Sequence, residues 1–319
     1  MYKILLFYKY IDLENPHAIA DWHKELCERL SLKGRIIIAH EGINATVGGL
    51  PEDIDHYKKQ VDSHALFVGI DFKEAYSVDA PFPRLRVVVK NEIVHLGLDP
   101  KVINARDAGT YLTPEEAHKL VSNKPDNLVI IDCRNKVETD IGTFEGSIRP
   151  NTNHFREFPE FVDANQDLLK DKQVLMYCTG GVRCERASAY IKSKNVAQEV
   201  FHIQGGIERY VEQFPNGHFK GKNYVFDGRL TVRITNDILA ECSLCSKPWD
   251  DYENCIRAAC NKHYIGCPKC VAHYQNACSQ QCHDLVYLHN APKRPMRKKT
   301  EHISLTSVQS VHRSNSELP

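Results

Sequence analysis

The sequence lacks three features that would each assign it to a class of proteins: a net charge, a long apolar run and an internal repeat. Lys and Arg number 41 and so do Asp and Glu, so any polyanion would have to bind to a local basic patch. The opening segment, MYKILLFYKY, is too short and too rich in lysine for a signal peptide, and no other run approaches membrane-spanning length. We therefore expect a soluble, cytoplasmic protein without a membrane partner.

The distribution of cysteine along the chain is the most informative feature of the composition. Of twelve cysteines, eight lie between Cys242 and Cys282. The cytosol keeps thiols reduced, so metal binding is favoured over a disulfide framework. The eight form pairs with two to four residues between partners, a spacing that lets both sulfurs reach one tetrahedral ion at ~2.3 Å. We predict about two structural Zn²⁺ ions, with the ligands Cys242, Cys245, Cys255, Cys260, Cys267, Cys270, Cys278 and Cys282.

Other states of this cysteine-rich segment stay open at this point. Reduced thiols or a few disulfides would leave it without metal, and an iron–sulfur cluster would offer a redox centre for oxygen chemistry. Three nearby histidines could replace a sulfur ligand, although a solvated surface histidine is the commoner case: His263, His273 and His283. The short spacers cannot build an ordinary core, so a metal would supply folding energy. No organic cofactor is indicated.

The length of 319 residues predicts an α+β and α/β multidomain chain. Residues 1–97 follow the order βαββαβ, which predicts a ferredoxin-like sheet with helices on one face. Residues 98–112 lack periodicity and are interpreted as a linker. Strands alternate with helices over residues 113–222, which predicts a doubly wound parallel sheet with its site at the carboxyl ends of the strands. The cysteine-rich module covers residues 223–290, and residues 291–319 are predicted to be a disordered tail, basic at first.

The segment VLMYCTGGVRCERASAYI places a cysteine where a predicted strand ends and a helix follows. Two glycines permit a turn whose backbone N–H groups point inward, and the helix aims its positive end at the same spot. Such a loop lowers the pKa of a thiol and favours the reactive thiolate. We predict that Cys178 is the nucleophile and that the active-site loop consists of Thr179, Gly180, Gly181, Val182 and Arg183.

Most cysteines are buried and inert, and this interpretation is preferred for Cys27 and Cys133. Cys184, six residues beyond Cys178, either packs in the helix or acts as a resolving thiol. Four residues separate Cys178 from Arg183, one fewer than a cysteine phosphatase needs. The smaller loop suits an added sulfur atom better than a phosphoryl group.

Three segments together resemble a rhodanese domain: VIIDCRNKVETDIGTFEGSIRP, VLMYCTGGVRCERASAYI and VFHIQGGIERY. In that family the matching cysteine carries a persulfide, which the resemblance assigns to Cys178. The family's Asp-x-Arg strand end is matched by Asp132 and Arg134, and its acidic position by Glu138. The resemblance implies that these three residues brace the loop.

The flanking segments GRIIIAHEGINATVGG, FREFPEFV and YVFDGRLTV, together with the cysteine-rich end, resemble the rhodanese-type tRNA uridine hydroxylases over about residues 1–290. That family joins an acylphosphatase-like domain, a rhodanese domain and a cysteine-rich end. The resemblance implies oxygen-dependent 5-hydroxylation of the wobble uridine, with tRNA and molecular oxygen as substrates. The loop alone predicts sulfur transfer from a small donor. The third interpretation is a non-catalytic RNA-binding scaffold stabilised by metal.

The sequence gives only weak signals for the residues that would contact RNA. Each basic candidate is more often a solvated surface charge than a contact to an RNA phosphate. The candidates are Arg84, Arg86, Arg183, Arg186, Lys293, Arg294, Arg297, Lys298 and Lys299. A tight turn that could face the site carries His40, Glu41 and Asn44. Tyr177 and Phe155 either stack on a base or belong to the core.

Overall fold

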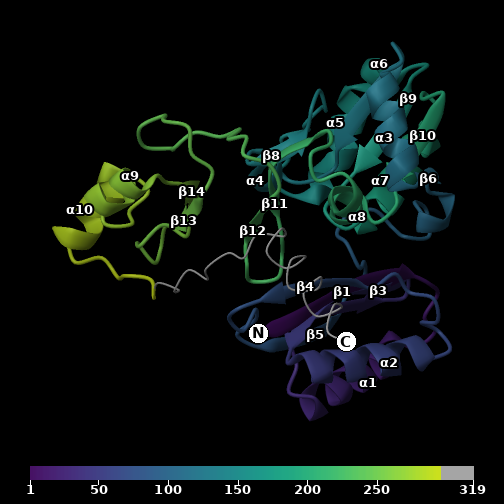
Figure 1. Cartoon of the computed structure of the whole chain (residues 1–319), viewed down its shortest axis with the longest axis horizontal. Helices are drawn as coiled ribbons and strands as arrows, with labels where there is room; N and C mark the ends of the chain where they lie inside the picture. The colour runs from purple at the N-terminus through teal and green to yellow at the C-terminus, as the bar shows by residue number, and fades with distance from the viewer. Residues whose placement is uncertain (296–319) are drawn as a thin grey trace, which may run out of the picture.

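The computed structural model describes residues 1–295. Within that range no helix is both long and apolar enough to cross a lipid bilayer. Figure 1 shows an amino-terminal sheet with its helices, an α/β body packed against that sheet, and a small module at the carboxyl-terminal end. The predicted tail residues Arg297, Lys298 and Lys299 lie outside the described residues.

The amino-terminal domain is a five-stranded sheet in the order β4-β1-β3-β2-β5, with two helices on one face (Figure 1). Alternate residues of β1, such as Leu5 and Phe7, pack under the helices, whereas Tyr8 points to the face that meets the α/β body. This arrangement confirms the ferredoxin-like prediction. The elements are β1 (Tyr2–Tyr10), α1 (Pro16–Arg29), β2 (Lys33–Ala39), β3 (Gly42–Gly49), α2 (Pro51–Ser63), β4 (Lys73–Ser77) and β5 (Leu85–Val89).

Strand β4 is absent from the prediction from sequence. It is a short edge strand that pairs only with β1, and its buried lysine, Lys73, breaks the hydrophobic pattern. The segment RLRVVVKNEIVHLG, for which one or two strands are expected, supplies one strand, β5. After β5 the chain runs along the domain boundary through Lys90, Glu92 and His95.

The α/β body contains a four-stranded parallel sheet in the order β6-β10-β9-β7. Alternate residues of β9 enter two separate cores, Met176 with α7 on one face and Leu175 with α8 on the other. Helices on both faces confirm the doubly wound prediction. The principal elements are α3 (Pro114–Asn123), β7 (Leu128–Asp132), β9 (Gln173–Tyr177), α7 (Val182–Ser193), β10 (Glu199–Ile203) and α8 (Gly206–Gln213). The short elements are α4 (Lys136–Thr139), η2 (Phe155–Glu157), α5 (Phe158–Ala164) and α6 (Gln166–Leu169).

The interpretation of residues 98–112 as a linker without structure is wrong at its carboxyl end. Strand β6 (Thr110–Leu112) pairs with β10 and forms an edge of the parallel sheet, and η1 (Ala105–Asp107) precedes it. Three residues held by backbone hydrogen bonds leave no side-chain period to detect in a sequence.

The remaining strands join the α/β body to the cysteine-rich module. Strand β11 (Phe219–Tyr224) pairs with β8 (Gly142–Phe144) and with β12 (Thr231–Arg233), so the predicted boundary at residue 222 falls inside a strand. The module contains β13 (Tyr252–Asn254), β14 (His263–Ile265), α9 (Pro268–His273) and α10 (Gln280–Tyr287).

The prediction of a disordered tail from residue 291 is wrong for its first residues, and residues 296–319 lie outside the described residues. The backbone N–H of Ala258 donates to the carbonyl of Pro292 at 2.9 Å, and that of Arg294 donates to the carbonyl of Ile256 at 2.7 Å. The ammonium of Lys293 lies over the Tyr287 ring. The first residues of this segment are therefore packed on the cysteine-rich module, because the chain at residues 256–258, just after β13, leaves backbone groups that they can pair with.

Candidate active site: a thiol loop on a cavity between two domains

Cys178 directly follows β9, and the loop after it runs straight into α7. The N–H of Gly181 points into the loop and donates to Cys178 Sγ at 3.1 Å. Gly181 has φ +100°, and a Cβ there would stand 2.8 Å from the Tyr8 hydroxyl. Glycine is required at this position on both counts. The predicted inward-facing amide is thus observed.

Burial by itself would raise the pKa of the Cys178 thiol, but several contacts act in the opposite direction. A hydrogen bond with the Cys184 thiol, the charge of Arg183 and the backbone N–H groups of Arg183 and Gly181 stabilise the anion. Together they lower the pKa of Cys178 to about 5. At neutral pH the sulfur is therefore a thiolate, the form that acts as a nucleophile.

We expect the alkylation of Cys178 by iodoacetamide to show this ionisation directly. The thiolate fraction rises with pH, so the rate should increase through about pH 5 and be level by pH 7. An ordinary thiol, with a pKa of ~8.5, would still be gaining rate above pH 8. Mass spectrometry of the peptide that contains Cys178 measures the rate. A profile that rises only above pH 8 would contradict the assignment of a thiolate.

Arg183 is held beside the sulfur by a buried carboxylate. Its two terminal nitrogens donate to the two oxygens of Glu138 at 2.6 and 2.7 Å, a bidentate pair. The Glu138 side chain is fully buried, and Thr179 Oγ1 also donates to it, at 3.2 Å. The guanidinium is therefore fixed next to the loop.

Asp132 and Arg134 lie at the end of β7, where Asp132 pairs with Tyr177 at the end of β9. Arg134 donates to both carboxylate oxygens of Asp132, at 2.8 and 2.6 Å, and to the carbonyl of Gly142 at 2.5 Å. Both side chains are fully buried. Their contacts tie the end of β7 to β8, and neither residue borders the cavity described below.

The glycine pair Gly205 and Gly206, at the start of α8, lets this helix approach the thiol loop. The N–H of Ile207 donates to the carbonyl of Cys178 at 2.9 Å, and that of Glu208 donates to the carbonyl of Thr179 at 3.1 Å. A Cβ on Gly206 would stand 2.4 Å from that same Cys178 oxygen. Glycine at this position is therefore what allows the helix to support the loop.

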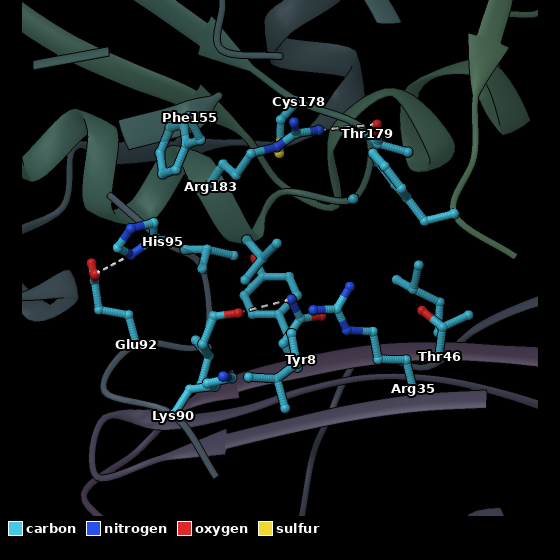
Figure 2. Close-up of a pocket in the computed structure, with 18 of the residues that line it drawn as sticks. Tyr8, Arg35, Thr46, Lys90, Glu92, His95, Phe155, Cys178, Thr179 and Arg183 are labelled. Carbon is cyan, nitrogen blue, oxygen red and sulfur yellow. Dashed lines mark hydrogen bonds and ion pairs between the residues drawn. The ribbon is translucent and has the colours of Figure 1, made fainter. Parts of the chain in front are cut away.

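A cavity of about 940 Å³ separates the thiol loop from the open face of the amino-terminal sheet. Figure 2 shows Cys178 and Arg183 on one side of it and Tyr8, Arg35 and Lys90 on the other. Cys178 is shielded from bulk solvent but borders this cavity. Its volume lies at the upper end of the ~300–1,000 Å³ typical of ligand sites.

Arg186 is fully buried and links the α/β body to the amino-terminal domain. Its terminal nitrogens bind Glu41 at 2.7 Å and the carbonyl of Leu98 at 2.8 Å, with Glu92 at 3.4 Å. The Tyr10 hydroxyl adds a bond to a carbonyl at the start of α7. Arg186 and Glu41 are thus committed to the domain interface and are not exposed to a phosphate.

The eight clustered cysteines form two groups of four. In the first, Cys242, Cys245, Cys267 and Cys270 place their sulfurs within 4.8 Å of one another. In the second, Cys255, Cys260, Cys278 and Cys282 do the same. The first and third pairs share one site and the second and fourth pairs the other. This interleaved arrangement cannot be read from the spacing, because adjacent pairs could equally well have joined.

The distances between sulfurs fit a single tetrahedral ion at each site. Cys245 and Cys267 are 3.8 Å apart, Cys260 and Cys278 3.7 Å. A tetrahedron with metal–sulfur bonds of ~2.3 Å has edges of about 3.8 Å. Disulfide sulfurs would be ~2.05 Å apart, and a four-iron cluster would spread the thiolates over different iron atoms. Two metal sites, each with four thiolate ligands, are therefore what this geometry accommodates.

Comparison with known proteins gives consistent matches along the chain. Family models match for the UPF0176 acylphosphatase like domain at residues 2–93, the rhodanese-like domain at 113–213 and the rhodanase C-terminal region at 220–283. The tRNA uridine(34) hydroxylase of Corynebacterium kroppenstedtii is 38% identical over 290 residues, which cover 88% of this chain and 98% of that protein. The protein of the same name from Staphylococcus saprophyticus is 36% identical, covering 88% and 90%. This chain belongs to the tRNA uridine(34) hydroxylase family.

The residues of this family member that the sequence offered as RNA contacts lie in different environments. Phe155 borders the cavity, whereas Tyr177 is fully buried and its hydroxyl accepts a hydrogen bond from the N–H of Phe144. Asn44 lines the cavity floor, and a ring nitrogen of His40 lies 2.8 Å from the carbonyl of Leu13. Arg84 and Arg86, at the edge strand β5, are exposed.

Cys27 and Cys133 are buried in apolar clusters. Cys184 is also buried, and its hydrogen bond with Cys178 helps to hold the thiolate. The residues missed from sequence were Tyr8, Glu92 and Glu208. The alternation along β1 places Tyr8 on the face away from the helices and was a usable signal for it.

Proposed function

We propose that this protein is a tRNA-modifying oxidoreductase that converts the wobble uridine to 5-hydroxyuridine with molecular oxygen. The observation that carries the proposal is an ionised cysteine, Cys178, on a cavity large enough for a nucleotide, in a chain related over most of its length to proteins named for this reaction. A base must leave its stack to reach a sulfur at such a depth.

The chemistry begins with the nucleophilic sulfur. The Cys178 thiolate, or the outer sulfur of a persulfide on it, adds to C6 of the uracil ring, and the C5=C6 electron pair moves onto C5. Electron-rich C5 then reacts with oxygen. Overall one oxygen atom replaces the C5 hydrogen as a hydroxyl group, and the other leaves as water. Two electrons and two protons complete the balance, and a thiol pair oxidised to a disulfide is a reductant class that supplies both.

The cavity opening suits a polyanion. Five basic side chains from both domains line it and are exposed: Arg35, Lys90, His95, His154 and Arg156. Phosphate contacts of this kind supply affinity and register, whereas the base itself would be recognised inside. The overall charge balance of the chain therefore does not conflict with binding to tRNA.

We infer that the two four-cysteine sites hold Zn²⁺ and that the ions are structural. All-thiolate tetrahedral sites favour zinc, and with four protein ligands each site is closed. The sites lie in the module and not on the cavity, so their role is to fold the module. Reduced thiols fit a cytoplasmic protein.

Nucleoside analysis of a strain that lacks the gene tests the function. We expect 5-hydroxyuridine and its derivatives to disappear from bulk tRNA in liquid chromatography with mass spectrometry, and to return when the gene is restored. Loss of a thiolated nucleoside with the hydroxylated ones intact would instead favour the alternative, a sulfurtransferase using the same loop. An unchanged nucleoside profile would refute both.

A further inference from the structure

Glu208, in the first turn of α8, lies against the thiol loop and has an unused oxygen. Its side chain borders the main cavity and also a smaller one of about 70 Å³ behind it. Its Oε2 atom is buried and has no hydrogen-bond partner within residues 1–295. The same atom lies 3.6 Å from the place where a Cβ would stand on Gly180. A buried carboxyl oxygen without a partner costs free energy, which a functional role would explain.

The charged groups around Glu208 are engaged elsewhere. Lys73 on β4 binds Asp71 at 3.0 Å, and the guanidinium Nε of Arg229 donates to Asp227 at 2.9 Å. Glu212, one turn further along α8, binds Arg209 at 2.9 Å. Each of these groups therefore has a partner that neutralises it, and Glu208 does not share in those pairs.

The other acidic residues on the main cavity are also committed. Glu92 accepts hydrogen bonds from the N–H groups of Leu96 and Gly97, and Asp227 is held by Arg229. Among the cavity-lining carboxyl groups of the described chain, only Glu208 has an oxygen both buried and free to accept a proton.

We propose that Glu208 is the base that removes the C5 proton in the last step of hydroxylation. This inference rests on the proposed function. At that stage C5 carries the new hydroxyl group and C6 is still bonded to the Cys178 sulfur. Glu208 Oε2 takes the C5 proton, and the electrons of the C–H bond form the C5=C6 double bond. The C6–S bond breaks as this double bond forms, and its electron pair returns to Cys178 as the thiolate. No oxidant or reductant is consumed in this step.

The ionisation of Glu208 suits the task. Burial raises its pKa to about 7, the charges of Lys73 and Arg229 oppose the rise, and those of Asp227 and Glu212 add to it. When the pKa of a group is near the working pH, a large fraction of the group is ionised and can accept a proton, and the protonated form can release that proton afterwards. Cys178 across the loop ionises at much lower pH, so the two groups titrate apart.

A single-turnover assay of Glu208→Gln with tRNA, oxygen and a dithiol reductant tests the assignment. Glutamine keeps the shape but cannot take the proton, so the covalent intermediate between Cys178 and the RNA should accumulate as a slow band on a denaturing gel. Product formation should fall by roughly 10² to 10⁴-fold. Glu199→Gln, which changes an exposed carboxyl group on β10 of the same domain, is the matched control and should behave as wild type.

Two results would overturn the proposal. One is product formed by Glu208→Gln at the wild-type rate, with the wild-type pH dependence. The other is a loss of product without accumulation of the covalent complex, which would place Glu208 in an earlier step or in folding. In either case the wild-type protein still hydroxylates tRNA, so the proposed function stands. Failure of the wild-type protein to hydroxylate would refute the function itself, and the Glu208 assignment with it.

Discussion

We expect the replacement of Cys178 by serine to reduce hydroxylation by roughly 10³-fold or more. Serine preserves the size of the side chain, but its hydroxyl does not ionise at neutral pH, whereas the wild-type sulfur has a pKa of about 5. In the mechanism that we propose, the variant then has no anionic sulfur to add to the pyrimidine ring. The measurement is the amount of 5-hydroxyuridine in tRNA from a deletion strain that expresses Cys178→Ser.

The matched control is Cys27→Ala, which removes another buried cysteine, from α1 in the core of the amino-terminal domain. It should restore the modified nucleoside at the wild-type level. Soluble expression and tRNA binding of Cys178→Ser, measured alongside, separate lost chemistry from lost folding. Full hydroxylation by Cys178→Ser would remove the sulfur from the mechanism.

We expect that removing the metal proposed for the two four-cysteine sites unfolds the cysteine-rich module while the other two domains remain folded. Its two sulfur-lined clusters bury few apolar side chains besides cysteine, which are Ile256, Tyr264, Ala277 and Val286, with Leu244, Trp249 and Tyr274 among the partly buried neighbours. So small an apolar set cannot offset the entropy of ordering the chain. Structural zinc in small domains contributes an apparent ~10–16 kcal/mol at pH 7. We expect two zinc ions per chain by elemental analysis, and protease cleavage within residues 240–290 after chelation.

Replacing one cysteine at a time tests each metal site separately. Cys267→Ser should lose the ion of the first site, and Cys278→Ser that of the second, because each is a ligand of one group only. Cys27→Ala should keep both ions. A chain that contains no metal, or a protease pattern that chelation leaves unchanged, would contradict the structural role.

The parallel sheet and its thiol loop were predictable from sequence because their signals are local. Apolar runs mark β7, β9 and β10, and the two glycines before Arg183 mark a turn of inward amides. Strands β4 and β6 escaped prediction, because each is a short edge strand held mainly by backbone pairing. Glu208 also escaped, because nothing in GGIERY says which way its carboxyl group points.

Local pattern alone was enough to predict the fold class of two domains, the turn of inward amides after Cys178 and the cysteine-rich character of the third part. Such features depend on residues that are neighbours in the chain. The cavity, the partner of Arg186 and the sorting of cysteine pairs into two sites needed the folded coordinates. Each of these joins residues far apart in sequence, as Arg186 joins Glu41 across 145 positions. The free oxygen of Glu208 belongs with them, since burial and the absence of a partner exist only once the domains have packed.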